Sequence, residues 1–350
     1  MNRKQRGELI RSKILSDVGS HPQDIVNHIA RKFSITPQAV HAHIQKLERE
    51  NWLRTTGSKR GKKYYLGTNR LYKTLFKFSE SIAEDKIWRD EYSHLFEGVT
   101  KNVKNICHYG FTEMVNNAID HSNGTEVSIA VGLNQKEIHI FIGDDGEGIF
   151  QRIRKLCGYE DERQAMFELS KGKLTTDPKR HTGEGIFFTS RAFDYFLIES
   201  KGLQFSHQEI RETDKFEESG IRAAKIGTSV LMVIDRNSQR ELEDIFDQFS
   251  SGPEEFRFNK TVVPIKLLQY GTENLISRSQ AKRVMARIQQ FEKVVFDFTD
   301  IENIGQAFAD EIFRVYSIAH PGIDILAINM NEPVTKMVNR AFAAKKEYLN

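Results

Sequence analysis

The segment 103–149 constrains the fold most, because its hydrophobic pattern changes from helical to strand periodicity and then ends in a glycine-rich turn. Apolar residues at helical spacing predict the buried face of one long helix: Val103, Ile106, Cys107, Phe111, Met114, Val115, Ala118 and Ile119. Residues 125–133 and 137–143 then alternate like two paired strands, joined by a turn at 134–136. The segment therefore predicts a unit of mixed helix and sheet.

The other face of the predicted helix is polar. Glu113, Asn117, Asp120 and His121 stand at positions i, i+4, i+7 and i+8, so they align where a ligand could meet a carboxylate and a carboxamide together. A stripe of this kind, taken alone, is usually a solvated helix face. Its meaning depends on the motifs that follow it in the chain.

The second predicted strand ends in Asp144-Asp145-Gly146-Glu147-Gly148. The glycines permit a ligand to touch the backbone, but the carboxylates beside them would repel a pyrophosphate, which argues against a dinucleotide-binding or Walker loop. The spacing also fails the calcium-loop pattern, because Gly146 falls two residues after Asp144 and not five. A carboxylate in such a turn suits a different task, which is to accept a hydrogen bond from the exocyclic amine of a neutral ring.

A third motif, Gly183-Glu184-Gly185, opens a predicted helix after a polar and basic segment. Backbone N–H groups at a helix start can hold phosphates. Basic side chains of the preceding segment would approach the same place, namely Lys171, Lys173, Lys179 and Arg180. The alternative is a flexible surface loop with a capping glycine.

In this order, the polar helix face, the acidic glycine turn and the 183–185 motif resemble the Bergerat-fold ATPases. That superfamily contains gyrase B, heat-shock chaperone ATPases, histidine kinases, mismatch-repair ATPases and the anti-sigma-factor serine kinases. The resemblance covers roughly residues 86–250 and implies ATP and Mg²⁺ as cofactors.

The resemblance also implies roles for particular residues. Asn117 would hold Mg²⁺, Glu113 would be the general base, and Asp144 would read the adenine amine. Residues 158–182 would form the ATP lid. The other nucleotide contacts that it implies are Gly146, Gly148, Gly183, Gly185 and Thr228.

Within the superfamily, a histidine kinase needs a phospho-acceptor histidine on a separate helical hairpin. His108 lies only nine residues before Asn117 on the same predicted helix, so it cannot serve. The Asn117-Ala118-x-x-His121 form is closer to the anti-sigma kinases. A charged insertion at residues 206–224, before the final strand, departs from the family pattern.

The N-terminal part of the chain is basic. Residues 1–67 carry 14 Lys and Arg against 5 Asp and Glu, whereas residues 68–350 carry 37 against 43. A basic block on an acidic remainder is typical of a nucleic-acid-binding module, although a basic surface can also be plainly solvated. Apolar residues at helical spacing predict three short helices here, and residues 52–66 predict a hairpin with a basic tip.

Three helices followed by a basic hairpin resemble the winged helix-turn-helix family. In that family the third helix faces base edges and the wing contacts phosphate, so the resemblance implies binding to double-stranded DNA. The residues implied on the third helix are Gln38, His41, Gln45 and Arg49, and those on the wing are Lys59, Arg60, Lys62 and Lys63. The alternative is a winged helix that makes only protein contacts, against which the positive charge argues.

After a polar break at residues 250–255, predicted strands at 294–298 and 323–328 alternate with helices. This alternation predicts an α/β layer structure with parallel strands. Residues 297–308 resemble the strand-loop-helix of STAS domains. STAS antagonists carry a phosphorylated serine at the start of that helix, where this chain has Gln306 and Ala307, so docking of a protein partner without phosphorylation is the simpler use.

Together these patterns predict a multidomain α+β protein. It would consist of a winged helix at 1–67, a helical connector at 68–85, a Bergerat-fold α/β sandwich at 86–250 and a small α/β STAS-like domain at 251–350. We expect an ATP-binding transcriptional regulator in which the nucleotide is the switch. The alternative is an anti-sigma-type serine/threonine kinase that phosphorylates a separate STAS partner, and the sequence leaves open whether the chain forms a homodimer.

Composition excludes some other classes. No apolar run reaches the ~18 residues of a spanning helix, and no secretory signal is present, so we expect a cytoplasmic protein without membrane contacts. The two cysteines, Cys107 and Cys157, are expected to pack as small apolar groups and not as part of a disulfide scaffold.

Overall fold

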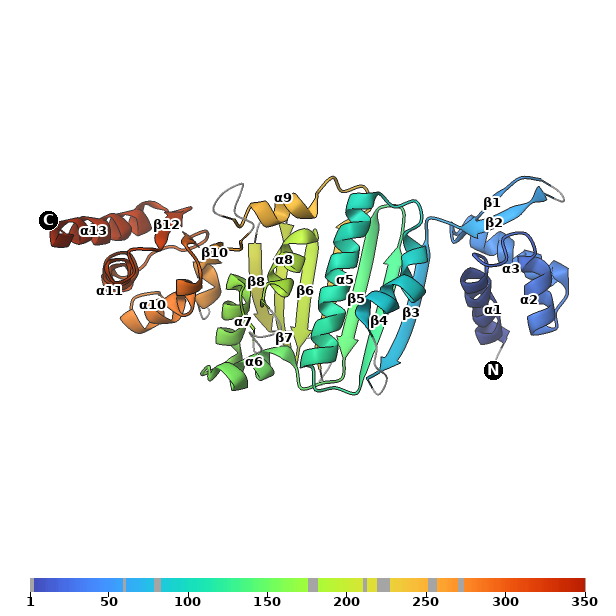
Figure 1. Ribbon diagram of the computed structural model, residues 1–350, viewed down its shortest axis with the longest axis horizontal. Coiled ribbons are helices and arrows are strands. Elements are labelled where there is room, and N and C mark those ends of the chain that lie inside the picture. Colours follow the sequence, from blue (N-terminus) through green and yellow to red (C-terminus); the bar gives the residue numbers. More distant parts are fainter. Residues whose placement is uncertain are drawn as a thin grey trace.

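The computed structural model describes residues 3–58, 61–78, 83–175, 182–209, 213–218, 227–250, 257–269 and 274–349. Three units follow one another along the longest axis of the molecule: a small helical unit at the N-terminus, a large sheet in the middle and a smaller α/β unit at the C-terminus (Figure 1). The multidomain α+β architecture predicted from the sequence is confirmed.

The N-terminal unit contains the predicted three helices and hairpin. The helices are α1 (Arg3–Asp17), α2 (Ile25–Phe33) and α3 (Pro37–Arg49), and the antiparallel hairpin joins β1 (Leu53–Thr56) to β2 (Lys63–Leu66). At the start of α3, Thr36 Oγ1 accepts the Ala39 N–H at 3.2 Å and Pro37 occupies the first helical position. This unit has its own apolar core, which includes Ile14, Ile29 and Ile44.

The central unit is a seven-stranded antiparallel sheet in the order β3-β4-β5-β9-β6-β7-β8. The strands are β3 (Arg70–Lys77), β4 (Glu126–Leu133), β5 (Glu137–Asp144), β6 (Tyr195–Ser200), β7 (Leu203–Gln208), β8 (Thr213–Glu218) and β9 (Ser229–Asp235). The helices are α5 (Lys101–His121), α6 (Ile149–Cys157), α7 (Glu162–Lys171), α8 (Gly185–Ala192) and α9 (Leu242–Asp247). In Figure 1, α5 and α8 cover the same face of the sheet, which buries the inward side chains of β4, β5 and β9.

The prediction of a helical connector at residues 68–85 is wrong in its first part. Residues 70–77 form β3, the edge strand, which pairs along its whole length with β4. Tyr72 and Phe76 are four apart, a spacing that fits one helix face but also one strand face. The exposed residues Leu71 and Leu75 distinguish the strand from the helix, because exposed and less exposed side chains alternate along residues 70–77, as a strand requires.

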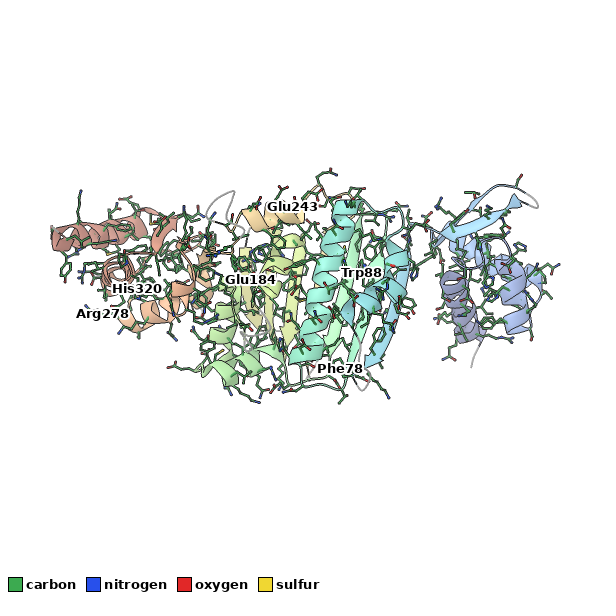
Figure 2. The ribbon with its side chains drawn as sticks, viewed as in Figure 1. Phe78, Trp88, Glu184, Glu243, Arg278 and His320 are labelled. Carbon is green, nitrogen blue, oxygen red and sulfur yellow. The ribbon has the colours of Figure 1, made fainter. Side chains whose placement is uncertain are left out.

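Helical structure does begin after residue 83. It comprises α4 (Glu84–Ile87), a π-helical segment (Trp88–Tyr92) and a 3₁₀ turn (Ser93–Phe96). The Trp88 ring, labelled in Figure 2, stacks on His108 with centroids 5.0 Å apart and meets Phe111 edge-on, which ties this segment to α5.

The charged insertion contributes strands to the sheet. Its described parts lie in β7 and β8, a hairpin at the edge opposite β3, and residues 210–212 and 219–226 lie outside the described chain. Buried polar contacts hold the hairpin: Arg191 of α8 bonds both oxygens of Asp214 at 3.0 and 2.8 Å, and His207 Nδ1 lies 2.9 Å from the same carboxylate.

The C-terminal unit has three parallel strands in the order β10-β11-β12, so the predicted parallel α/β layer is confirmed. The strands are β10 (Lys260–Pro264), β11 (Lys293–Asp297) and β12 (Asp324–Ile328). The helices are α10 (Arg278–Met285), α11 (Gln306–Asp310), which continues as a π-helical segment (Glu311–Tyr316), α12 (Ser317–Ala319) and α13 (Glu332–Leu349). Strand β10 was not predicted.

The central and C-terminal units share one apolar core. Phe187 of α8 lies 4.6 Å from Phe258, between ring centroids, and 4.8 Å from Phe249. Phe258 in turn meets Phe291 at 5.3 Å. Aromatic side chains therefore connect the helix that begins at Gly185 directly with the C-terminal unit.

Two expectations from composition have structural counterparts. Among the described residues, no helix combines the length and the apolar character that a membrane span requires. Cys107 is buried in the core and Cys157 is half-buried, and neither is in a disulfide.

Candidate functional site

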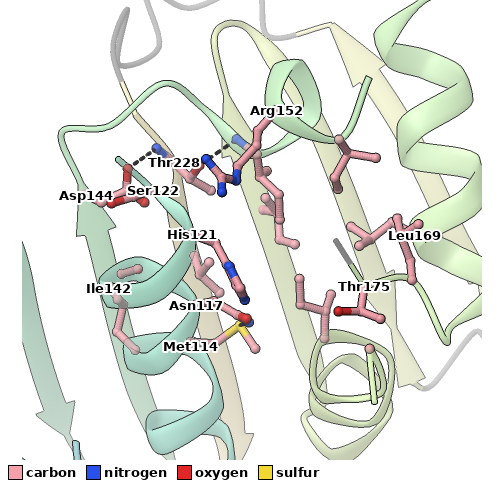
Figure 3. Close-up of a pocket in the computed structure, with 18 residues that line it drawn as sticks. Met114, Asn117, His121, Ser122, Ile142, Asp144, Arg152, Leu169, Thr175 and Thr228 are labelled. Carbon is pink, nitrogen blue, oxygen red and sulfur yellow. Dashed lines mark hydrogen bonds between the residues drawn. The ribbon is translucent and has the colours of Figure 1, made fainter. Parts of the chain in front are cut away.

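A pocket of about 850 Å³, its open mouth included, lies between α5 and the residues around α7 and α8 (Figure 3). Strands β5, β9 and β6 form its floor, and most of its wall is aliphatic, including Ile142, Ile186 and Val230. Five of its lining residues belong to the motifs that the sequence analysis singled out: Asn117, His121, Asp144, Gly183 and Thr228. The fold therefore brings three separate motifs to one cavity.

Asp144 ends β5, and the neighbouring backbone fixes its carboxylate. Its Oδ1 accepts the Gly146 N–H at 2.8 Å and the Thr228 N–H at 3.2 Å, while Thr228 Oγ1 accepts the Ile149 N–H at 2.9 Å. The hydrogen bonds that this carboxylate makes within the described residues end on Oδ1, which leaves Oδ2 for a ligand. Burial raises the pKa of the Asp144 carboxyl, and the two backbone donors oppose that rise.

The glycines of this turn shape it but do not line the pocket. A Cβ at Gly146 would lie 2.1 Å from the carbonyl oxygen of Ser122, so only glycine lets the turn pack against the end of α5. Gly148 has a φ of 87° and precedes α6. Both glycines therefore act through the position of Asp144.

The other two carboxylates of the motif point elsewhere. Asp145 accepts the Thr125 N–H at 2.6 Å and the Glu126 N–H at 3.0 Å, which joins the turn to the start of β4. Glu147 pairs with Arg152 at 2.8 Å. Of the three acids, Asp144 is the one that lines the pocket, and so the repulsion of phosphate expected from the motif is weaker than its composition indicates.

Glu113 and Asn117 lie one turn apart on α5 and reach different places. Asn117 lines the pocket, where its Nδ2 is 4.0 Å from the sulfur of Met114, a weak acceptor. Glu113 does not line the pocket but packs against the start of α8, since a Cβ on Gly185 would lie 1.9 Å from Glu113 Oε2. Of these two side chains from one helix, the carboxamide thus lines the pocket and the carboxylate lies against the start of α8.

The C-terminal unit contains the strand-loop-helix anticipated from the sequence, with β11 followed by a loop and α11, which begins at Gln306. Residues 280–335 match a family described as the STAS-like domain of unknown function (DUF4325). The C-terminal domain is STAS-like. The match does not extend to the N-terminal or central units, and no curated protein was found to match the chain.

The STAS-like domain contacts the described part of the segment predicted as the ATP lid. Lys171 Nζ donates to Glu168 Oε1 at 2.7 Å and to the Ala286 carbonyl at 2.9 Å, and Lys173 Nζ donates to the Gln290 carbonyl at 2.9 Å. In this structure both ammonium groups therefore donate hydrogen bonds to acceptors on the STAS-like domain or α7, and their approach to a phosphate stays a prediction.

The same segment also borders the pocket. Leu169, Leu174 and Thr175 line it, so residues that touch the cavity alternate with residues bound to the STAS-like domain. Lys179 and Arg180, the other basic residues of the predicted lid, lie outside the described residues.

The N-terminal unit presents the predicted stripe on α3. Gln38, His41, Gln45 and Arg49 are all exposed, whereas Val40, Ile44 and Leu47 of the same helix are buried. On the hairpin, Lys62 and Lys63 are half-buried, and Lys62 Nζ lies 5.0 Å from the Tyr64 ring. Lys59 and Arg60, predicted at the tip, lie outside the described residues.

Sequence reasoning missed two features of the site. Arg152 lines the pocket, and its position one turn into the helix after Gly148 could have indicated this from the sequence. The buried pair Glu168 and Lys171 forms a charged cluster with the half-buried Arg287, whose Nη1 lies 3.8 Å from Glu168 Oε2. No local pattern points to this cluster, because Arg287 belongs to a different domain.

Proposed function

We propose that this protein is an ATP-binding transcriptional regulator, in which the nucleotide state of the central unit changes the DNA affinity of a winged N-terminal unit and the STAS-like domain transmits the change. The observation that carries the proposal is the Asp144 carboxylate, held by two backbone N–H groups at the floor of an apolar pocket.

This arrangement suits adenine. A purine needs aliphatic walls above and below its ring, which Met114, Ile142 and Ile186 supply. The 6-amino group donates hydrogen bonds, and the Oδ2 of Asp144 is an acceptor at the end of β5. Guanine has an oxygen at that position, and two acceptors would repel each other. The pocket therefore favours ATP over GTP.

The phosphates would lie toward the start of α8, whose backbone N–H groups favour negative charge. Asn117 is the side chain that would hold Mg²⁺ there together with the phosphate oxygens, since an amide oxygen is a ligand that this ion accepts. Among the described residues, no group of three or more His, Cys, Asp and Glu is arranged to hold a metal alone. Mg²⁺ would supply charge neutralisation at the phosphates.

The contacts of the lid segment support a transmitting role for the STAS-like domain. A change in the position of Leu174 or Thr175 on nucleotide binding would act on Lys173, whose ammonium bonds the Gln290 carbonyl. Thr261 Oγ1 donates to the Lys171 carbonyl at 2.8 Å, which adds a second connection from β10. Pocket and domain thus share one short piece of chain.

The roles on α5 predict different effects for two substitutions. Asn117→Ala should abolish measurable Mg²⁺-ATP binding, whereas Glu113→Ala should retain ATP affinity and lose turnover, because a general base acts only on the attacking nucleophile. Isothermal titration and phosphate release measure the two quantities. Asn116→Ala removes the same amide one residue away from the pocket and serves as the control. Equal loss of binding in both variants would contradict the assignment.

The N-terminal unit predicts a salt-dependent affinity for duplex DNA. Replacing Lys62 or Lys63 with Gln should each lower the slope of log affinity against log salt by about one unit, whereas Gln45→Ala or Arg49→Ala should change sequence preference. Lys73→Gln, which removes an exposed charge from the central sheet, is the matched control. Titrations at several salt concentrations measure these slopes.

The switch requires that ATP changes the affinity for DNA by the same factor as DNA changes the affinity for ATP. If ATP changes DNA affinity by a factor of about 5–150, DNA must change ATP affinity by the same factor, because allosteric coupling is reciprocal. The same DNA titrations, repeated with and without ATP, test this. Identical DNA affinity with and without ATP would refute the switch, although it would not contradict ATP binding or DNA binding by themselves.

One observation favours a second function, a serine/threonine kinase of the anti-sigma type. The Glu113 carboxylate lies against the first turn of α8, where a base would be needed to deprotonate an incoming hydroxyl. Transfer of the γ-phosphate to a separate STAS protein, lost in Glu113→Ala, would support this function. Absence of DNA binding at low salt would favour it over the regulator.

A further inference from the structure

A second pocket lies at the junction of the N-terminal unit and the central sheet, and it shares no lining residue with the pocket at Asp144. Its walls come from the start of β1, the connection between β2 and β3, the chain after the 3₁₀ turn and the chain after β9. Three arginines line it, Arg54, Arg70 and Arg236, together with one acid, Glu97. The pocket is therefore strongly basic.

Arg70 is 7% exposed, yet the groups that accept its hydrogen bonds within the described residues are backbone carbonyls. Its Nε donates to Gly67 at 2.9 Å and its Nη1 donates to Leu95. Within the described part of the chain, no carboxylate forms an ion pair with this guanidinium. Burial of a charged group without a counter-ion is costly, so an anion would stabilise this position.

The other two arginines add to the positive charge and are also paired with neutral groups. Arg236 Nη1 donates to the carbonyls of Thr68 at 3.1 Å and Asn134 at 2.9 Å, and Arg54 lies 5.0 Å from the centre of the Tyr65 ring. Burial lowers the pKa of Arg70 to about 10; the charges of Arg236 and Arg54 add to this shift, and the charge of Glu97 opposes it.

We propose that this pocket binds a phosphate group, with Arg70 at its base and Arg54 and Arg236 on either side. Guanidinium groups bind phosphate oxygens through paired N–H donors, and three of them around one cavity are poorly compensated by the single exposed Glu97. Arg54 belongs to the N-terminal hairpin, whereas Arg70 begins β3 and Arg236 directly follows β9 of the central sheet. A bound phosphate would therefore fix the hairpin relative to the central unit.

Two sources could supply this chemistry, a free phosphorylated small molecule or the phosphodiester backbone of bound DNA. The probe for the first is inorganic pyrophosphate, titrated by calorimetry into the full chain at constant ionic strength. Arg54→Gln is the informative variant, because Arg54 is exposed and its guanidinium rests on the Tyr65 ring at the surface, so the fold should persist. We expect at least about 10-fold weaker pyrophosphate binding in this variant, and the same in Arg236→Gln.

Arg89→Gln is the matched control, since it removes an exposed arginine charge outside the pocket. Loss of pyrophosphate binding in Arg54→Gln, with an unchanged salt slope for DNA, identifies a free phosphorylated ligand. A DNA salt slope lower by about one unit in Arg54→Gln, with pyrophosphate competing against DNA, identifies the DNA backbone. Pyrophosphate affinity and DNA slope that both equal those of the wild type in Arg54→Gln and Arg236→Gln would overturn the proposal.

Discussion

Asp144→Asn is expected to weaken ATP binding by about 100-fold, which corresponds to ~2.7 kcal/mol. The reason is geometric. The backbone N–H groups of Gly146 and Thr228 both donate to Oδ1, so the substituted side chain must keep its oxygen there. Its NH₂ group then occupies the place of Oδ2 and faces the adenine amine, which places two donors against each other. Calorimetric titration of both proteins with ATP measures the difference.

Asp145→Asn is the control for this substitution. It makes the same carboxylate-to-amide change at the adjacent residue, whose carboxylate accepts hydrogen bonds from Thr125 and Glu126 outside the pocket. It should leave ATP affinity unchanged. A wild type that binds GTP as tightly as ATP would show that Asp144 does not read adenine. A melting temperature that falls equally in both variants, without a specific loss of ATP binding in Asp144→Asn, would assign Asp144 a structural role.

Glu168→Ala is expected to lower the free energy of unfolding by about 3–5 kcal/mol. Glu168 and Lys171 are both buried, and removal of the carboxylate leaves the ammonium with the Ala286 carbonyl and without its ion-pair partner. Chemical denaturation of the full chain measures the loss. Glu243→Ala, which removes an exposed carboxylate from α9, should change stability by less than about 1 kcal/mol.

The double variant Glu168→Gln, Lys171→Met separates the charge from the packing. Burial raises the pKa of Glu168 and lowers that of Lys171 to about 8, so desolvation outweighs the attraction between them. Replacing both charges should therefore recover most of the stability lost in the single variant. A double variant as unstable as Glu168→Ala would show that the loss comes from packing.

The same pair predicts a pH dependence. Because the pKa of Lys171 lies below its ordinary value of 10.5 in the folded chain, the unfolded chain binds the proton more tightly between about pH 8 and 10.5. The contribution of this group to stability should therefore rise with pH across that window, and Lys171→Met should remove the rise.

The sequence predicted those elements whose pattern is local. The helix over α5, the hairpin of β4 and β5 and the parallel α/β layer follow from periodicity, because burial of one face imposes spacing on nearby residues. Strand β3 was predicted as helix, since Tyr72 and Phe76 fit both periods and its partner β4 lies about 50 residues further along the chain.

Around the pocket, the sequence by itself determined which polar side chains lie together on short stretches of chain. The turn at residues 144–148 specifies the direction of Asp144 through its own backbone, and the helical repeat aligns Glu113 with Asn117. These relations are local, so residue type and spacing are enough to state them.

Only the tertiary structure decided what the basic residues do. Lys171 and Lys173 are long side chains that could reach a phosphate or a distant carbonyl with equal ease, and the sequence does not distinguish these ends. Docking of the STAS-like domain places the Ala286 and Gln290 carbonyls within reach, where Lys171 donates to the first and Lys173 to the second. Likewise Arg54, Arg70 and Arg236 meet only because three distant segments converge, so their shared charge is a property of the fold and not of any motif.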